Sequence, residues 1–196
     1  MTIPAAVKRS SGSKLWPLLS IVPVFLATAV VLRLEGRLWI CSCGQFFVWV
    51  GQACSSNTSQ HFFDPYSFTH VLHGFLFFWL IAWLVPRLGS NWQLTLAIVL
   101  EAAWEVLENT NFIIERYRTA TAAIGYTGDT VVNSLGDILC CTVGFMIARR
   151  LGLRRSLIVF LALEFILILW IRDSLLLEIL MLVVPVDLIR TWQMCG

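Results

Sequence analysis

The segment WQLTLAIVLEAAWEVLEN, which runs from Trp92 to Asn109, joins an apolar half to a half rich in acidic residues. The polar side chains of its second half are those of Glu101, Glu105, Glu108 and Asn109. The spacing i, i+4, i+7 and i+8 places all four on one face of a helix. An ionised carboxylate at bilayer depth costs at least ~3 kcal/mol unless it is paired or hydrated. A stripe of three glutamates in an apolar helix therefore predicts a functional site.

The composition indicates an integral membrane protein. The chain has 196 residues, of which 58% are hydrophobic and 13% charged, whereas roughly a quarter of the residues of a soluble domain are charged. The net charge of +2 is too small to suggest a nucleic-acid partner. No linker rich in proline, glycine or serine divides the chain after its first dozen residues, which favours a single helical bundle.

We expect an all-α, polytopic transmembrane bundle of five to six spans. A tail at residues 1–14 precedes the bundle at residues 15–196, and a cysteine-containing outer segment occupies about residues 33–66. The first apolar run also resembles a secretory signal, but its length favours a retained span. A sixth span, Ser174–Ile189, is the least certain because it contains Pro185 and Asp187. The other expected spans are Leu15–Leu32, Phe68–Val85, Trp92–Asn109, Thr130–Ala148 and Ser156–Ile171.

The distribution of lysine and arginine favours a cytoplasmic N-terminus. Arg149, Arg150, Arg154 and Arg155 then lie on the cytoplasmic side, between the fourth and fifth spans. With this orientation the polar residues of three spans fall in the outer half of the membrane. His70 and His73 share a face of the second span, and a stripe of Asp129, Asn133 and Asp137 descends the fourth.

Imidazole and carboxylate groups together suit zinc, iron or manganese, so a divalent metal ion is the cofactor that this pattern favours. The proposed metal ligands are His70, His73, Glu101, Glu105 and Asp129. The proposed catalytic residues are Glu105, Glu108 and Asp137, as general acids or bases. The proposed substrate-binding residues are Asn109, Asn133, Arg116 and Arg118, whose guanidinium groups could hold a phosphate or carboxylate.

Three functions stay open at this point. The first is a metal- or acid/base-dependent enzyme that acts on a membrane lipid or a lipid-linked substrate. The second is a non-catalytic subunit or scaffold whose polar network fixes helix packing, binds other membrane subunits, or holds a pigment or haem through a histidine. The third is an ion-coupled transporter, which the apolar inner halves of the helices disfavour because they offer no continuous polar path.

Three cysteines lie in the expected outer segment, where disulfides are stable. Cys41 and Cys43 are separated by a single residue, so a bond between them would close a small, strained ring. We therefore expect Cys54 to bridge Cys41 or Cys43.

From residue 36 onward the chain resembles a family of conserved bacterial inner-membrane proteins of unknown function. The resemblance implies a location in the bacterial inner membrane, and it implies no established activity, cofactor or catalytic residue. It rests on the strings Gly36–Gly44 (GRLWICSCG), Asn57–His61 (NTSQH), Ser67–Phe75 (SFTHVLHGF), Trp104–Asn109 (WEVLEN), Ile114–Thr119 (IERYRT), Tyr126–Asp137 (YTGDTVVNSLGD) and Arg172–Leu175 (RDSL).

Overall fold

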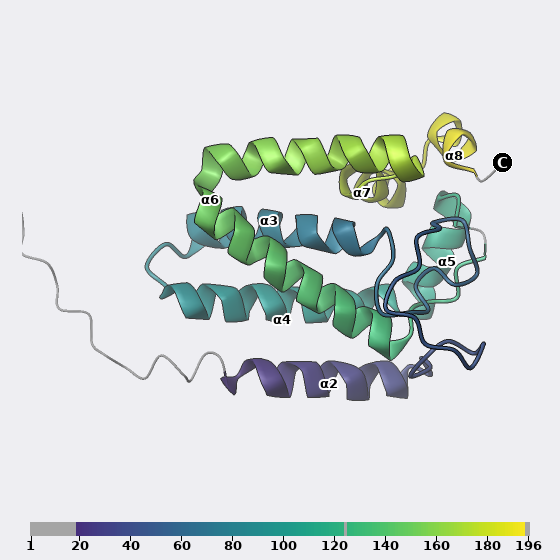
Figure 1. Cartoon of the computed structure of the whole chain (residues 1–196), viewed down its shortest axis with the longest axis horizontal. Helices are drawn as coiled ribbons and strands as arrows, with labels where there is room; N and C mark the ends of the chain where they lie inside the picture. The colour runs from purple at the N-terminus through teal and green to yellow at the C-terminus, as the bar shows by residue number, and fades with distance from the viewer. Residues whose placement is uncertain (1–18, 124, 195–196) are drawn as a thin grey trace, which may run out of the picture.

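The computed structural model describes residues 19–123 and 125–194, and this part of the chain is all-α, as predicted (Figure 1). Apart from its helices it contains only an isolated β-bridge between Trp49 and Phe63. The helices are α2 (Ile21–Leu34), α3 (Ser67–Leu84), α4 (Ser90–Glu108), α5 (Asn111–Ala120), α6 (Val131–Ile171), α7 (Leu175–Val183) and α8 (Asp187–Gln193).

The helix α6 is a hairpin of two apolar segments. Gly152 interrupts it with φ 70° and ψ 172°, a conformation that favours glycine because it has no Cβ. In Figure 1 the first segment crosses α3 and α4, and the second turns back along the opposite face of α3. The two segments correspond to the fourth and fifth spans expected from the sequence.

Glycine lets α3 and α6 pack at close range. A Cβ atom at Gly74 would overlap the carbonyl oxygen of Cys141, and one at Gly144 would overlap that of Val71. Small residues at such crossings allow helix backbones to approach each other. Phe145, fully buried next to this crossing, packs in an apolar cluster with Ile98 of α4. The cluster fills the half of the bundle that lies away from the polar residues.

The C-terminal region does not form the sixth span that was considered from the sequence. Residues 175–183 form a helix of 9 residues, which is only ~14 Å long against a hydrocarbon core of ~30 Å. The helix ends there, with Val184 as its C-cap, and the separate helix α8 of 7 residues follows. Both short helices lie at the same end of the molecule as α5 (Figure 1).

One of the described helices, α3, is by itself long and apolar enough to cross a membrane, and α2 is a shorter apolar helix. The predicted tail at residues 1–14, and the beginning of the first expected span, lie outside the described residues.

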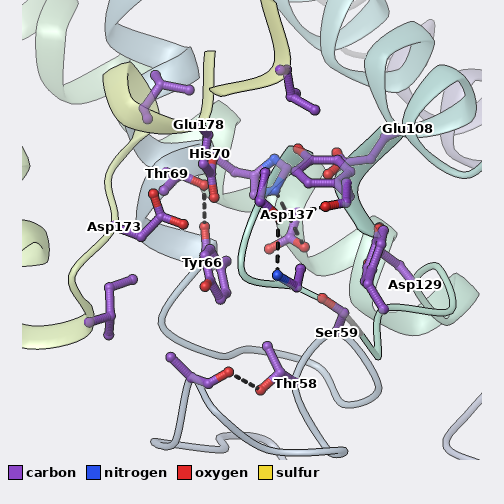
Figure 2. Close-up of a pocket in the computed structure, with 18 of the residues that line it drawn as sticks. Thr58, Ser59, Tyr66, Thr69, His70, Glu108, Asp129, Asp137, Asp173 and Glu178 are labelled. Carbon is purple, nitrogen blue, oxygen red and sulfur yellow. Dashed lines mark hydrogen bonds and ion pairs between the residues drawn. The ribbon is translucent and has the colours of Figure 1, made fainter. Parts of the chain in front are cut away.

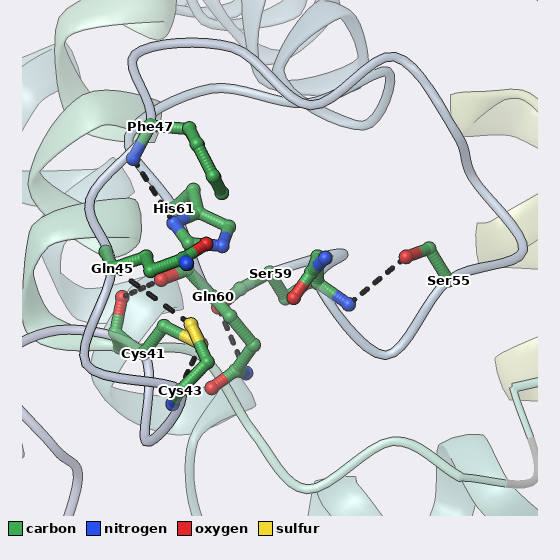
Figure 3. The surroundings of a disulfide bond; sticks show 10 residues. Cys41, Cys43, Gln45, Phe47, Ser55, Ser59, Gln60 and His61 are labelled. Carbon is green, nitrogen blue, oxygen red and sulfur yellow. Dashed lines mark hydrogen bonds between the residues drawn. A yellow bond between two sulfur atoms is a disulfide. The ribbon is translucent and has the colours of Figure 1, made fainter.

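The expected disulfide pairing was wrong. Cys41 is bonded to Cys43, with a Cα–Cα distance of 5.2 Å (Figure 3). The chain makes a tight turn here, in which the backbone N–H of Gly44 donates to the carbonyl oxygen of Cys41 at 3.1 Å. This turn brings the two sulfur atoms together. Cys54 is also disulfide-bonded, but to neither of these residues.

Candidate functional site

Two histidines of α3 meet one glutamate of α4 in the interior. The Nδ1 atom of His70 lies 2.6 Å from Oε1 of Glu101, and Nδ1 of His73 lies 3.0 Å from Oε2 of the same carboxylate. The helical spacing of His70 and His73 places both rings on the face of α3 that α4 covers. Glu101 is fully buried, so its charge depends on these two imidazoles.

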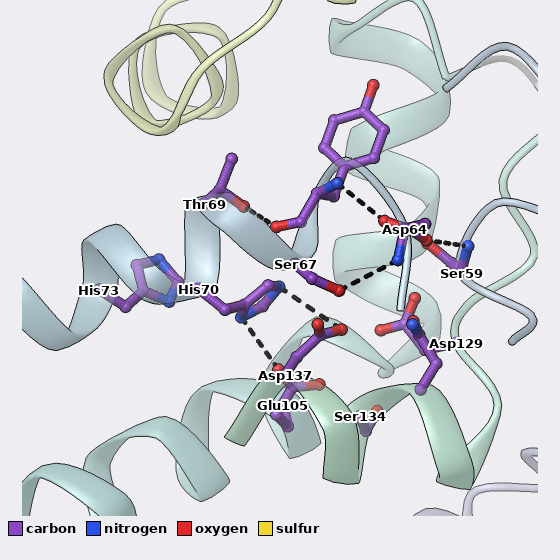
Figure 4. A network of polar contacts seen from close by, with 12 residues as sticks. Ser59, Asp64, Ser67, Thr69, His70, His73, Glu105, Asp129, Ser134 and Asp137 are labelled. Atoms are coloured by element: carbon purple, nitrogen blue, oxygen red, sulfur yellow. Dashed lines mark hydrogen bonds and ion pairs between the residues drawn. The ribbon is translucent and has the colours of Figure 1, made fainter. Parts of the chain in front are cut away.

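The ring of His70 also faces two further carboxylates (Figure 4). Its Nδ1 atom lies 3.2 Å from Oε1 of Glu105, one helical turn beyond Glu101. Its Nε2 atom lies 3.8 Å from Oδ2 of Asp137, which α6 contributes. One imidazole thus stands between acidic groups from two helices, and the close crossing of α3 and α6 brings Asp137 within reach.

A second polar group lies at the end of α4. The side-chain amide of Asn109 donates to Oδ2 of Asp129 at 2.9 Å, and its Oδ1 accepts from the backbone N–H of Asp129 at 2.7 Å. The hydroxyl of Tyr126 donates to the other oxygen of Asp129 at 2.9 Å. Asn109, expected to bind substrate, therefore fixes the loop before α6.

Several buried oxygen atoms near His70 have no hydrogen-bond partner among the described residues. They are both carboxylate oxygens of Glu105, Oε2 of Glu108 and Oδ1 of Asp137. Buried polar atoms are nearly always paired, and an unpaired one points to a missing partner such as a water or an ion. Unpaired atoms on three neighbouring carboxylates indicate a site for a cation.

The geometry defines two sets of residues around His70 that could hold a metal ion. One is His70, His73 and Glu101, and the other is His70, Glu105 and Glu108; within each set the candidate ligand atoms lie within 4.8 Å of one another. Asp129, the remaining predicted ligand, belongs to neither set, because Asn109 and Tyr126 hold its carboxylate.

The structure places the other predicted substrate-binding residues away from the histidines. Nε of Arg116 donates to the carbonyl oxygen of Leu182 at 2.8 Å, and Nε of Arg118 donates to that of Tyr126 at 2.6 Å. Asn133 is buried, and its side-chain nitrogen has no partner within residues 19–123 and 125–194. The binding roles expected for these residues stay predictions.

A cavity of about 830 Å³ adjoins the histidines (Figure 2). The sequence analysis did not assign several residues of its polar wall: Tyr66, Tyr117, Tyr126, Asp173 and Glu178. Glu178 comes from the tract Ser174–Ile189 that was considered as an uncertain span, and Asp173 directly precedes that tract. The signal that could have found them is an acidic residue within an apolar run, the same signal as in α4.

Three acidic groups of the cavity wall that lie outside the long apolar helices have altered pKa values. Burial raises the pKa of Asp173 to about 7, and it raises that of Glu178 well above its usual value, with Asp173 adding to the effect. Burial also raises the pKa of Asp129, although hydrogen bonds from Asn109 and Tyr126 oppose the rise. The cavity wall thus favours protonated acids unless a cation is near.

The comparisons with known proteins identify a bacterial family of unknown function. Residues 32–195 match the family described as "Protein of unknown function (DUF2585)", and the chain belongs to this family. It is 43% identical to UPF0314 protein R03235 of Rhizobium meliloti, in an alignment of 197 positions that covers 98% of each chain. It is 42% identical to a UPF0314 protein of Paracoccus denitrificans, over 87% of this chain and 88% of the other. No solved structure matches the chain.

Proposed function

We propose that this protein is a multi-span enzyme of the bacterial inner membrane that uses a divalent metal ion to hydrolyse or transfer part of a lipid or lipid-linked substrate. The observation that carries the proposal is the meeting of two imidazoles with buried carboxylates, some of whose oxygens have no partner. Nitrogen and oxygen ligands of this kind suit zinc, manganese or iron.

The outward-facing residues support several membrane spans. Monomeric soluble proteins rarely expose a continuous apolar surface of this extent. The second segment of α6 alone exposes Leu157, Ile158, Leu161, Phe165, Ile166 and Leu169 at 45–69%. On α2 the exposed side chains include Val22, Leu26, Val30 and Leu34. Contact with lipid accounts for these surfaces.

The charges support the orientation with the site on the outer side. The turn of α6 at Gly152 lies at the end of the molecule far from α5 and α7 (Figure 1). Two pairs of arginines flank this turn, at residues 149–150 and 154–155. Arginine is enriched on the cytoplasmic side of inner-membrane proteins. The polar cluster, at the opposite end, would then open away from the cytoplasm.

The residues around the imidazoles fit distinct roles. A bound divalent ion would polarise the substrate and activate a water molecule. Glu105, whose Oε1 contacts His70 and whose Oε2 has no partner among the described residues, would accept a proton from that water. Asp137 faces Nε2 of His70 and would fix the orientation of its ring, as carboxylates do for metal-bound histidines. Glu108 lines the cavity and would donate a proton to the leaving group.

Two alternatives have less support. A transporter needs a polar path to the other side, and the apolar cluster of Ile98, Ala97 and Phe145 fills that half of the bundle. Haem binding through one imidazole would give the buried carboxylates around it no role. A scaffold role would not explain why Oε2 of Glu105 has no partner among the described residues.

Metal analysis tests the proposal. We expect the protein, purified in dodecyl maltoside after growth with zinc and manganese, to hold about one equivalent of a divalent metal. In the variants His70→Ala/His73→Ala and Glu101→Gln, the metal content should fall at least about tenfold. Glu115→Gln is the control, because Glu115 is an exposed acid of α5. Wild-type protein without metal, or substituted protein that keeps it, would contradict the proposal.

A further inference from the structure

The cavity beside the histidines is acidic on more than one wall. The helices α4 and α6 contribute Glu108 and Asp137, respectively. The loop before α6 contributes Asp129, and the C-terminal region contributes Asp173 and Glu178 (Figure 2). Neither lysine nor arginine is among the described residues that line it. Apart from His70 and His73, which contact Glu101, a phosphate or carboxylate group would meet only acidic and neutral side chains there.

The arginines closest in sequence to these walls donate to backbone carbonyl oxygens instead. The bonds run from Arg116 to Leu182, from Arg118 to Tyr126 and from Arg190 to Thr121. Their guanidinium groups hold α5, the following loop and the C-terminal helices together. They do not pair with the acids of the cavity, so these acids either keep a proton or need a cationic ligand.

Two of the acids that line the cavity have a buried oxygen atom without a hydrogen-bond partner among the described residues. Glu108 is 9% exposed and Asp137 is 4% exposed, and both line the cavity. Oε2 of Glu108 and Oδ1 of Asp137 have no hydrogen-bond partner within the described part of the chain. The metal ion proposed above does not account for the charge of the whole cavity, because Asp129, Asp173 and Glu178 line the cavity but belong to neither candidate metal set.

The remaining lining residues are aromatic and apolar. Tyr66, Tyr117 and Tyr126 stand near the acids, and the rings of Tyr117 and Tyr126 lie 5.3 Å apart, edge to face. Aromatic faces together with carboxylates are the usual surroundings of a bound ammonium group. An apolar strip leads from this pocket to the outside of α4, where Leu100 is 37% and Leu107 47% exposed.

We propose that the ligand of this cavity is an amphiphile with a cationic amine headgroup. The headgroup binds among the acids and tyrosines, and the hydrocarbon chain lies along the strip formed by Leu76, Phe77, Leu100, Trp104 and Leu107. This inference rests on the proposed function, because it names the class of substrate for the proposed reaction. The binding itself does not need the metal.

Two probes of equal chain length test the headgroup. Purified protein in dodecyl maltoside is titrated with hexadecyltrimethylammonium and, separately, with hexadecyl phosphate, and tryptophan fluorescence reports binding because Trp104 lines the cavity. We expect the ammonium probe to bind at least about tenfold more tightly than the phosphate probe. Equal affinities, or tighter binding of the phosphate, would overturn the inference.

Substitutions on the C-terminal wall locate the binding. Asp173→Asn/Glu178→Gln should lower the affinity for the ammonium probe at least about tenfold and leave the metal content unchanged. The single variant Glu178→Gln serves if the double variant does not fold, and Glu115→Gln is the matched exposed control. An ammonium preference that persists in both wall variants would refute the assignment.

The same titration separates this inference from the proposed function. Glu101→Gln should lose the metal but keep its preference for the ammonium probe, because Glu101 does not line the cavity. Metal-free wild-type protein that still selects the ammonium probe would end the metal proposal alone. Metal-loaded protein without this selectivity would end the headgroup proposal alone.

Discussion

At the scale of single residues, Asn109 connects two parts of the site. Its amide bonds to both the side chain and the backbone of Asp129 and also donates to the carbonyl oxygen of Glu105 at 3.0 Å. It is 1% exposed, so water cannot replace these bonds. The residue that ends α4 therefore also fixes the loop that begins α6.

We expect Asn109→Ala to destabilise the protein by about 3 kcal/mol, because the substitution leaves the Asp129 carboxylate and backbone N–H buried with fewer partners. Thermal unfolding in detergent, followed by circular dichroism, measures the effect. Gln45→Ala removes an exposed polar side chain and should leave the melting temperature unchanged. An Asn109→Ala melting temperature equal to that of the control would show that the amide pair is not structural.

Asp173 makes stability depend on pH. Its folded-state pKa, raised by burial to about 7, exceeds the unfolded value of 3.8, so the folded protein binds the proton more tightly. This contribution to stability is complete below pH ~4 and is lost as the pH rises through about 7. The melting temperature should therefore fall between pH 4.5 and 8. We expect this fall to be smaller in Asp173→Asn and unchanged in Glu115→Gln. An identical slope in both variants would contradict the assignment.

At the scale of elements, the crossing of α3 and α6 decides whether the site forms. His70 stands on α3 four residues before Gly74, and Asp137 stands on α6 seven residues before Gly144. Both glycines lie where one helix touches the backbone of the other. The distance between His70 and Asp137 therefore depends on two residues that have no side chain.

We expect Gly74→Ala and Gly144→Ala each to destabilise the bundle by about 1–3 kcal/mol, because a methyl group at either position forces the helices apart. Both variants should also bind less metal, since His70 moves away from Asp137. Gly89→Ala is the control, because nothing lies within 4 Å of a Cβ added there. Melting temperature and metal content equal to those of Gly89→Ala would show that the crossing tolerates side chains.

At the scale of the whole molecule, polarity is divided between two ends. Acids, histidines and tyrosines line one cavity together with residues of α5 and α7, and the arginine pairs flank the turn of α6, which lies at the other end of the molecule (Figure 1). The proposed membrane arrangement follows from this division, with five crossings formed by α2, α3, α4 and the two segments of α6. An odd number of crossings places the two termini on opposite sides.

Reporter fusions test this arrangement. We expect alkaline phosphatase fused after Gln193 to be active, which requires export, and a fluorescent protein inserted at Gly152 to be bright, which requires the cytoplasm. Alkaline phosphatase at Gly152 is the matched control and should be inactive. The reverse pattern would place the site on the cytoplasmic side, and activity at both positions would exclude a crossing by the second segment of α6.

The sequence by itself determined the helices and the polar stripes. The spacing of apolar residues and the length of an apolar run are local properties of the sequence. For this reason α3 and α4 begin and end within two residues of the expected spans. The spacing of Glu101 and Glu105, and of His70 and His73, fixed the faces that these residues occupy. The helical rise and turn are the same in any tertiary structure, and this is why these predictions held.

The tertiary structure alone decided which groups meet. The return of Asp173 and Glu178 to the cavity and the hydrogen bond from Arg116 to Leu182 of α7 join residues that lie far apart in the sequence. Such contacts depend on how the loops close and on where a glycine lets two backbones touch. These are properties of the whole packed chain, and a repeating local pattern does not encode them.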